Sequence, residues 1–192
     1  MDFPIKTQKE IHEFFDANDG KEFIEYWNRN QNEYLYRIKY YYFLQEKIGT
    51  YTYDAKTLML RIKSKLSLFK QRLMGVDRLK GIKSEIKIGP NWVSITDQMV
   101  RYLLEKEPVI DKMFKQGIAA DELFVQTLCW NSEFKANIYQ GGPSRLIDWT
   151  RGKPYVWAEE DFDEIKNSKC LFVRKISNKN HLADMISEQL LR

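Results

Sequence analysis

The sequence predicts one mixed α/β domain in which helices and strands alternate along a chain of 192 residues. Several segments place apolar residues at helical spacing, and short aromatic or apolar runs between them are typical of strands. No internal repeat, low-complexity tract or long linker divides the sequence. The 43% of hydrophobic residues are enough for one sizeable core, so we expect residues 1–192 to form a single domain.

The first three predicted elements are a helix and two strands. Thr7 and Glu10 form a capping box, which predicts a helix that begins there and ends near Gly20. Residues 22–27 are short and aromatic enough for a strand. In residues 34–42 every second residue is tyrosine or isoleucine, and this alternation favours a strand with one aromatic face.

The middle of the chain predicts one long helix and several shorter elements. Apolar residues in the segment 54–74 stand among many lysines and arginines, which suits an amphipathic helix ended by Gly75 and exposing a basic, solvated face. Residues 82–88 resemble a strand. Thr96 can cap a helix that runs to about Glu105.

The remaining elements follow the same alternation. They are predicted as helices at 109–116 and 120–128, a strand at 145–149, a helix at 159–166, a strand at 170–175 and a helix at 179–191.

The net charge, the cysteines and the length of the apolar runs exclude some classes of protein and leave others open. A net charge of +4 favours an anionic partner, but a phosphorylated small molecule fits as well as nucleic acid. Cys129 and Cys170 each lie in an apolar stretch, which predicts buried free thiols in a reducing compartment. No apolar run approaches the roughly 18 residues that a bilayer span needs, and no signal-peptide pattern begins the chain. We therefore expect a soluble, cytoplasmic protein.

Metal and phosphate motifs are scarce in the sequence. His12 and His181 stand alone in predicted helices, so zinc is not expected, and neither a glycine-rich phosphate loop nor a Gly-x-Ser-x-Gly turn occurs. Asp161 and Asp163 form an Asp-x-Asp triplet of the kind that can hold the metal of a nucleotide-sugar. The acids crowded into residues 159–164 favour instead a solvated first turn that complements the helix dipole.

A few residues could carry chemistry. Asp121 and Glu122 are adjacent carboxylates beside an apolar, aromatic helix face, which suits a general base, although ordinary acids at a helix start fit equally. Trp149 could offer a flat face to a sugar ring or belong to the core. Arg174 and Lys175 end an apolar strand and could offset phosphate charge, although basic residues are common there.

Five segments in order carry a family resemblance. They are Asp2 to Lys6, Gly89-Pro90-Asn91-Trp92 with Ser94, Asp121-Glu122 with Thr127-Leu128, Arg145 to Trp149, and Leu171 to Lys175. In this order and at this spacing they resemble the core-2/I-branching β-1,6-N-acetylglucosaminyltransferases, grouped as glycosyltransferase family 14. Xylosyltransferases share much of the pattern, so a UDP-xylose transferase of the same family stays open.

The resemblance implies a chemistry and a donor site. It implies a GT-A-like mixed sheet flanked by helices and an inverting transfer from a UDP-sugar, with no divalent metal or other cofactor. Glu122 is then the general base, and Lys175 matches the lysine that contacts the donor diphosphate, with Arg174 beside it. A second basic residue upstream falls between Arg151 and Lys153, which are the candidates for that role.

The resemblance also implies an acceptor site. Glu25 matches a glutamate that binds acceptor hydroxyls, Arg37 fits a nearby arginine after a shift of one residue, and Trp149 matches a ring-stacking tryptophan. Asp121 is assigned to the acceptor as well. Another basic acceptor residue of the family falls near Glu33 or Tyr34 here, so we expect an acceptor other than the mucin-type core disaccharide.

The departures from the family suggest a particular setting. Disulfide cysteines of secretory members are absent, which suggests a cytosolic, bacterial-type member that works on a surface polysaccharide, with peripheral membrane association left open. Family members carry an N-terminal nucleotide-binding segment before the Asp-Phe-Pro-Ile motif, so we expect a truncated chain or a donor half supplied separately. An inactive carbohydrate-binding remnant is the main alternative. A nucleic-acid-binding domain, suggested only by the basic helix 61–72, is not expected.

Overall fold

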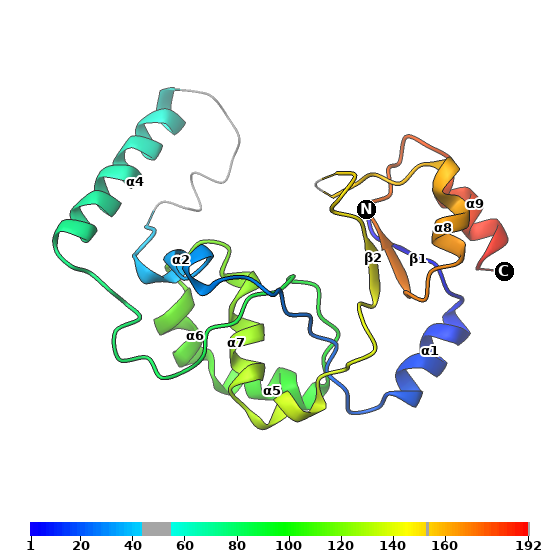
Figure 1. Cartoon of the computed structure of the whole chain (residues 1–192), viewed down its shortest axis with the longest axis horizontal. Coiled ribbons are helices and arrows are strands. Elements are labelled where there is room, and N and C mark those ends of the chain that lie inside the picture. Colours follow the sequence, from blue (N-terminus) through cyan, green and yellow to red (C-terminus); the bar gives the residue numbers. More distant parts are fainter. Residues whose placement is uncertain (44–54, 153, 192) are drawn as a thin grey trace. The chain divides into compact units, whose positions relative to one another are not determined.

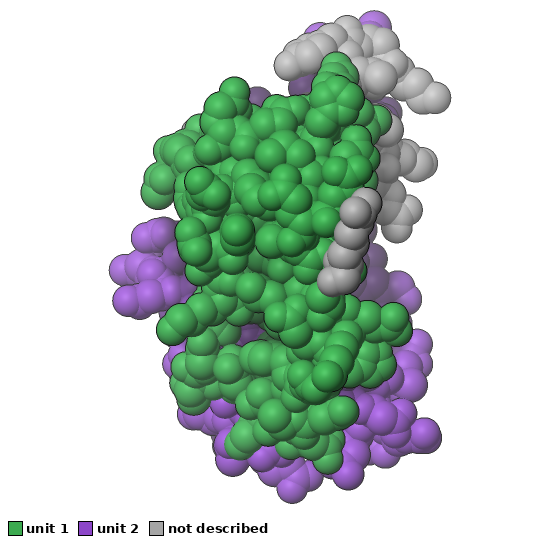
Figure 2. Space-filling view, turned by 90° about the vertical axis from the view of Figure 1, so that its right-hand side faces the viewer, with its two compact units in different colours: residues 1–23, 139–192 green, residues 24–138 purple. Residues whose placement is uncertain are grey.

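The chain forms two compact units in a computed structural model that describes residues 1–43, 55–152 and 154–191 (Figure 1). Unit 1 comprises Met1–Phe23 and Tyr139–Arg192, and unit 2 comprises Ile24–Ile138 (Figure 2). Each unit has a core of its own. The assignment of the whole chain to one domain stays a prediction.

Unit 1 contains a mixed three-stranded sheet. The strands are β1 (Phe3–Pro4), β2 (Arg145–Ile147) and β3 (Phe172–Arg174), in the order β1-β3-β2. β1 pairs antiparallel with β3, whereas β2 pairs parallel with it, so that Val173 stands opposite Leu146 on one side. The expected mixed α/β class and the two strands near residues 145 and 172 are confirmed.

The helices of unit 1 begin where the sequence places caps and acids. They are α1 (Gln8–Ala17), the 3₁₀ turn η4 (Glu159–Asp161), α8 (Phe162–Lys166) and α9 (Leu182–Gln189). The capping box of α1 is confirmed, because the Thr7 amide donates to Glu10 at 2.7 Å and the Glu10 amide donates to the Thr7 hydroxyl at 3.2 Å. The core consists of Ile5, Trp157, Phe162, Ile165, Val173, Ile176, Leu182 and Ile186.

Unit 2 is built mainly from helices. They are α2 (Tyr36–Lys39), α4 (Ala55–Leu73), α5 (Asp97–Glu105), α6 (Glu107–Phe114) and α7 (Phe124–Trp130), with the 3₁₀ turns η1 (Gln31–Glu33), η2 (Ala120–Glu122) and η3 (Glu133–Asn137). Thr96 caps α5 as predicted, since its hydroxyl accepts from the Met99 amide at 3.1 Å. The predicted long helix is confirmed over Ala55–Leu73, followed by Gly75 with a φ of +66°. Its predicted first residue, at position 54, lies outside the described residues.

The strand predicted over residues 34–42 is wrong, because this segment forms η1 and α2. The buried members of the alternating set are Tyr34, Ile38 and Tyr42, which are four residues apart, while Tyr36 is 48% exposed. A spacing of four is helical, so burial follows the helix period inside a sequence that also alternates by two.

The segments 22–27 and 82–88 also contribute no strand to the described sheet, although each was predicted as one. They run close together, and the Trp27 amide donates to the Ile88 carbonyl at 2.9 Å. Further amides of the second segment bond to side chains of α7 and the residue after it. The Lys87 amide donates to the Thr127 hydroxyl at 3.1 Å and the Glu85 amide donates to Asn131 at 3.0 Å. These side-chain acceptors replace a neighbouring strand.

The predicted helix 120–128 is divided at Leu123. Ala119 has a left-handed φ of +46°, η2 follows it, and α7 begins only at Phe124. The break leaves Asp121 and Glu122 in a tight turn, so their backbone is available to the neighbouring loop. This turn carries the predicted catalytic carboxylate.

Candidate functional site

Glu122 is paired with Arg37 in unit 2. The Arg37 Nη1 donates to Glu122 Oε2 at 2.5 Å, and the two side chains are 16% and 28% exposed respectively. Burial lowers the pKa of Arg37, but the hydrogen bond and the charge of Glu122 outweigh this effect and raise it. The other carboxylate oxygen, Oε1, makes no hydrogen bond within the described part of the chain. It is therefore available to a bound hydroxyl group.

The turn around Glu122 is held by the loop Gly89-Pro90-Asn91. The Gly89 amide donates to the Glu122 carbonyl at 3.0 Å, and Asn91 Nδ2 donates to Asp121 Oδ2 at 2.7 Å. The buried Gln126 reaches the same loop, because its Nε2 donates to the Pro90 carbonyl at 2.7 Å. These bonds fix the backbone that carries both carboxylates.

Glu25 approaches the same loop from the other side. A Cβ atom placed on Gly89 would lie 2.0 Å from the Glu25 carbonyl oxygen and 3.1 Å from Gln126 Cγ. Only a residue without a side chain allows this approach. The structure thus places the Glu25 backbone against the loop that holds the Asp121–Glu122 turn, and the Arg37 side chain against Glu122.

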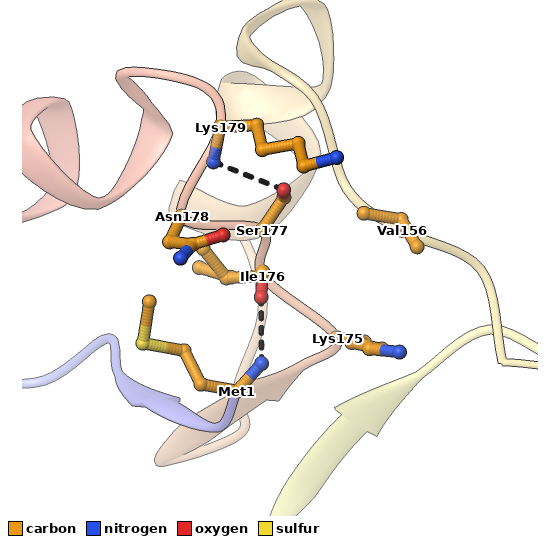
Figure 3. A pocket seen from close by; sticks show the side chains of 7 residues that line it. All are labelled: Met1, Val156, Lys175, Ile176, Ser177, Asn178 and Lys179. Atoms are coloured by element: carbon orange, nitrogen blue, oxygen red, sulfur yellow. Dashed lines mark hydrogen bonds between the residues drawn. The ribbon is translucent and has the colours of Figure 1, made fainter.

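In unit 1, Lys175 lines a cavity of about 480 Å³ (Figure 3). The other lining residues are Met1, Val156, Ile176, Ser177, Asn178 and Lys179. The Lys179 amide donates to the Ser177 hydroxyl at 3.0 Å, which folds the segment after β3 into a turn. Neither Lys175 nor Lys179 has a salt bridge among residues 1–43, 55–152 and 154–191. The cavity can therefore attract an anion with two uncompensated ammonium groups.

Arg151, expected at the donor diphosphate, is surrounded by acids. Its guanidinium pairs with Asp148, with Asp161 at 3.1 Å and with Glu164 at 3.0 Å. It also lies over the Tyr155 ring at 4.4 Å. Hydrogen bonds from Arg151, and then from the Thr150 hydroxyl and the backbone, hold the pKa of Asp148 well below its usual range. The positive charge of Arg151 is therefore offset by these three carboxylates of the same unit.

The remaining predicted residues have different surroundings. Arg174 forms an ion pair with Asp2, and Asp2 also forms an ion pair with Arg145, with 3.3 Å between Arg145 Nε and Asp2 Oδ2. Trp149 is 52% exposed on a loop whose turn is closed by Asp148, so its ring face is open to solvent. Lys153 lies outside the described residues.

The sequence analysis missed Asn91, Gln126 and Lys179 as individual site residues. Helical spacing could not have found Lys179, because it lies in a turn, or Gln126, because the helix is broken between it and Glu122. Asn91 belongs to the Gly89-Pro90-Asn91-Trp92 motif, but the sequence predicts no role for its side chain, because its hydrogen-bond partner Asp121 is 30 residues away.

The Asp-x-Asp triplet is used structurally. Asp161 accepts from Arg151, from the Tyr155 hydroxyl at 3.0 Å and from the Ala158 amide at 2.9 Å. No group of three or more potential metal ligands occurs in the part of the chain that the structure describes. Both cysteines are free, with Cys129 buried as predicted and Cys170 only partly buried.

A comparison with curated proteins finds no match, whereas a comparison with models of protein families does. Residues 1–177 match the model of the family named Branch, described as core-2/I-branching enzyme. The matched range includes every described site residue except Asn178 and Lys179. Because it covers well over half of the 192 residues, the chain belongs to the core-2/I-branching family of glycosyltransferases.

Proposed function

We propose that this glycosyltransferase moves N-acetylglucosamine from its UDP-sugar to a glycan hydroxyl, with inversion and without a divalent metal, on a GT-A-like architecture. The observation that carries the proposal is the Glu122 carboxylate, which is oriented by Arg37 through one oxygen and is unbonded at the other. A cytoplasmic surface-polysaccharide precursor is the acceptor class that we propose.

The transfer requires one proton acceptor. The acceptor oxygen attacks the anomeric carbon, its proton passes to Glu122 Oε1, and the bond from the anomeric carbon to the phosphate oxygen breaks to release UDP. Arg37 keeps Oε2 occupied, so the proton is taken by the oxygen that faces the acceptor. Glu25 and Asp121 are proposed to bind further acceptor hydroxyls, because carboxylates accept hydrogen bonds strongly.

The leaving diphosphate requires positive charge. Lys175 and Lys179 line a cavity in which the Ser177 side chain supplies a further polar group. We propose that Lys175 binds the diphosphate and that Lys179 assists it. Fixed cations at the leaving group stabilise the developing charge, which is a role that a metal ion performs in other transferases.

The base is tested by Glu122→Gln, which keeps the shape of the side chain and removes its basicity. Transfer from UDP-N-acetylglucosamine to a panel of glycan acceptors should fall by about 10²- to 10⁴-fold. Glu105→Gln, at an exposed position of α5, should leave the rate unchanged. Full activity of Glu122→Gln would refute the assignment, and loss of activity with a chelator would refute metal independence.

The donor cavity is tested by calorimetric titration with UDP. Lys175→Gln should weaken binding about tenfold or more, because a hydrogen bond to a charged group is lost. Lys169→Gln removes an equal charge at an exposed position of the same unit and should have no effect. If the unmodified chain fails to bind UDP but binds glycans, it is a carbohydrate-binding remnant. A preference for UDP-xylose would identify the alternative donor.

A further inference from the structure

Two described side chains of the long helix α4, cyan in Figure 1, are buried, and both are polar. Thr57 and Gln71 are buried, at 5% and 8% exposure. Gln71 bonds to the backbone of Tyr41 in both directions, accepting from its amide at 2.8 Å and donating to its carbonyl at 2.9 Å. These hydrogen bonds help to attach the helix, on which Leu60 and Leu68 are partly buried.

Six apolar residues of α4 form an exposed stripe. The stripe consists of Leu58, Met59, Ile62, Leu66, Phe69 and Leu73. The least exposed is Ile62, at 50%, and the most exposed is Leu73, at 74%. Because successive residues in a helix are rotated by about 100°, spacings of three and four place these side chains on one face. This arrangement reverses the usual orientation of an amphipathic helix on a protein core.

The stripe is bordered by basic residues. Lys63 and Lys70 lie along one edge of the stripe and Lys65 lies along the other, and all three are exposed. The segment 55–73 contains no aspartate or glutamate. A continuous apolar face between two rows of cations complements one kind of surface, in which an apolar interior lies beneath anionic groups.

We propose that α4 binds the surface of an anionic lipid bilayer, lying in its plane with the stripe at the acyl boundary and the lysines at the phosphates. The helix has 19 residues and extends about 28 Å. Its lysines prevent it from crossing the bilayer, and none of the helices in the described ranges has the length and apolar character of a membrane span.

Other partners fit the stripe less well. Nucleic acid would be contacted by the lysines but would leave the apolar side chains beside phosphates. A second copy of the chain would bring two acid-free basic helices together, which places like charges in contact.

The test is cosedimentation of the full chain with phosphatidylcholine vesicles that contain, or lack, about a third of phosphatidylglycerol. Binding should require the anionic lipid and weaken with salt. Replacing Lys63, Lys65 and Lys70 by Gln should weaken binding by about a hundredfold, since each basic residue near the surface contributes about a factor of five. The control triple Lys80→Gln, Lys83→Gln and Lys112→Gln removes the same charge at other exposed positions of unit 2 and should change binding far less.

The apolar contribution is tested separately. Leu66→Gln with Phe69→Gln keeps the charge and should weaken binding by at least about a hundredfold. Leu104→Gln, at a 67% exposed position on α5, is the matched control and should have no effect. All of these side chains are exposed, so circular dichroism and thermal melting should show folded variants.

Four results would overturn the proposal. The first is that the chain does not bind anionic vesicles, and the second is that the two lysine triples weaken vesicle binding equally. The third is that the Leu66→Gln and Phe69→Gln variant binds vesicles as the unmodified chain does. The fourth is that the stripe variants abolish self-association or oligonucleotide binding of a chain that does not bind vesicles.

Discussion

Gly89→Ala tests whether the close approach of the loop to Glu25 builds the candidate site. The new Cβ would lie 2.0 Å from the Glu25 carbonyl oxygen, and real contacts of this kind exceed 3.0 Å, so one segment must move by about 1 Å. The contacted atom is backbone, which cannot rotate away. Overpacking against backbone costs about 3 kcal/mol, the upper end of the usual range, and the reduced entropy of the unfolded chain returns about 0.4 to 1 kcal/mol. We expect a net loss of about 2 kcal/mol.

Gly75→Ala in the same unit is the matched control. Gly75 has a φ of +66° and nothing within 4 Å of its added Cβ, so the change costs only backbone strain, offset by the same entropy effect. A net loss of about 1 kcal/mol or less is expected.

Urea unfolding followed by tryptophan fluorescence gives both free energies from the same unit. If Gly89→Ala is no more destabilising than Gly75→Ala, the close approach of Glu25 to Gly89 is wrong. In glycan titrations Gly89→Ala should also weaken acceptor binding, because the loop holds the turn that carries the proposed acceptor carboxylates. UDP binding should persist, because the lysine cavity belongs to unit 1.

Two further predictions concern ion pairs. A double-mutant cycle of Arg37→Gln and Glu122→Gln should give a coupling energy of about 1 to 2 kcal/mol, between the values for exposed and buried pairs, and a value near zero would contradict the pairing. Asp148 has a lowered pKa when folded, so its stabilising effect is complete above its unfolded pKa of about 3.9 and is lost as pH falls through the lower folded value. Urea midpoints below about pH 5 should therefore fall less in Asp148→Asn than in the unmodified chain, and parallel curves would contradict this role.

Local signals in the sequence predicted part of the fold well. Thr7 with Glu10 and Thr96 specify helix starts within a few residues, and the structure confirms both. The predicted strands at 22–27, 34–42 and 82–88 failed because strands depend on distant partners. The amides of 82–88 bond to Thr127 and Asn131, about 45 residues away, and no local pattern shows this.

The site was predictable to a similar degree. Adjacent Asp121 and Glu122 are visible in the sequence, and the family resemblance added Glu25 and Arg37. The direct bond between Arg37 and Glu122, which are 85 residues apart, required the structure. For Arg151 the resemblance suggested a free cation at the donor. In the fold its charge is offset by three carboxylates, Asp148, Asp161 and Glu164.

The sheet of unit 1 joins the two ends of the chain. β1 pairs with β3 across about 170 residues, and the whole of unit 2 lies between them in the sequence. During synthesis, unit 2 is a continuous stretch that can collapse as soon as it leaves the ribosome, whereas the central strand β3 emerges only after all of unit 2. β1 therefore cannot pair until β3 has been synthesised, so unit 1 is completed after unit 2 can fold.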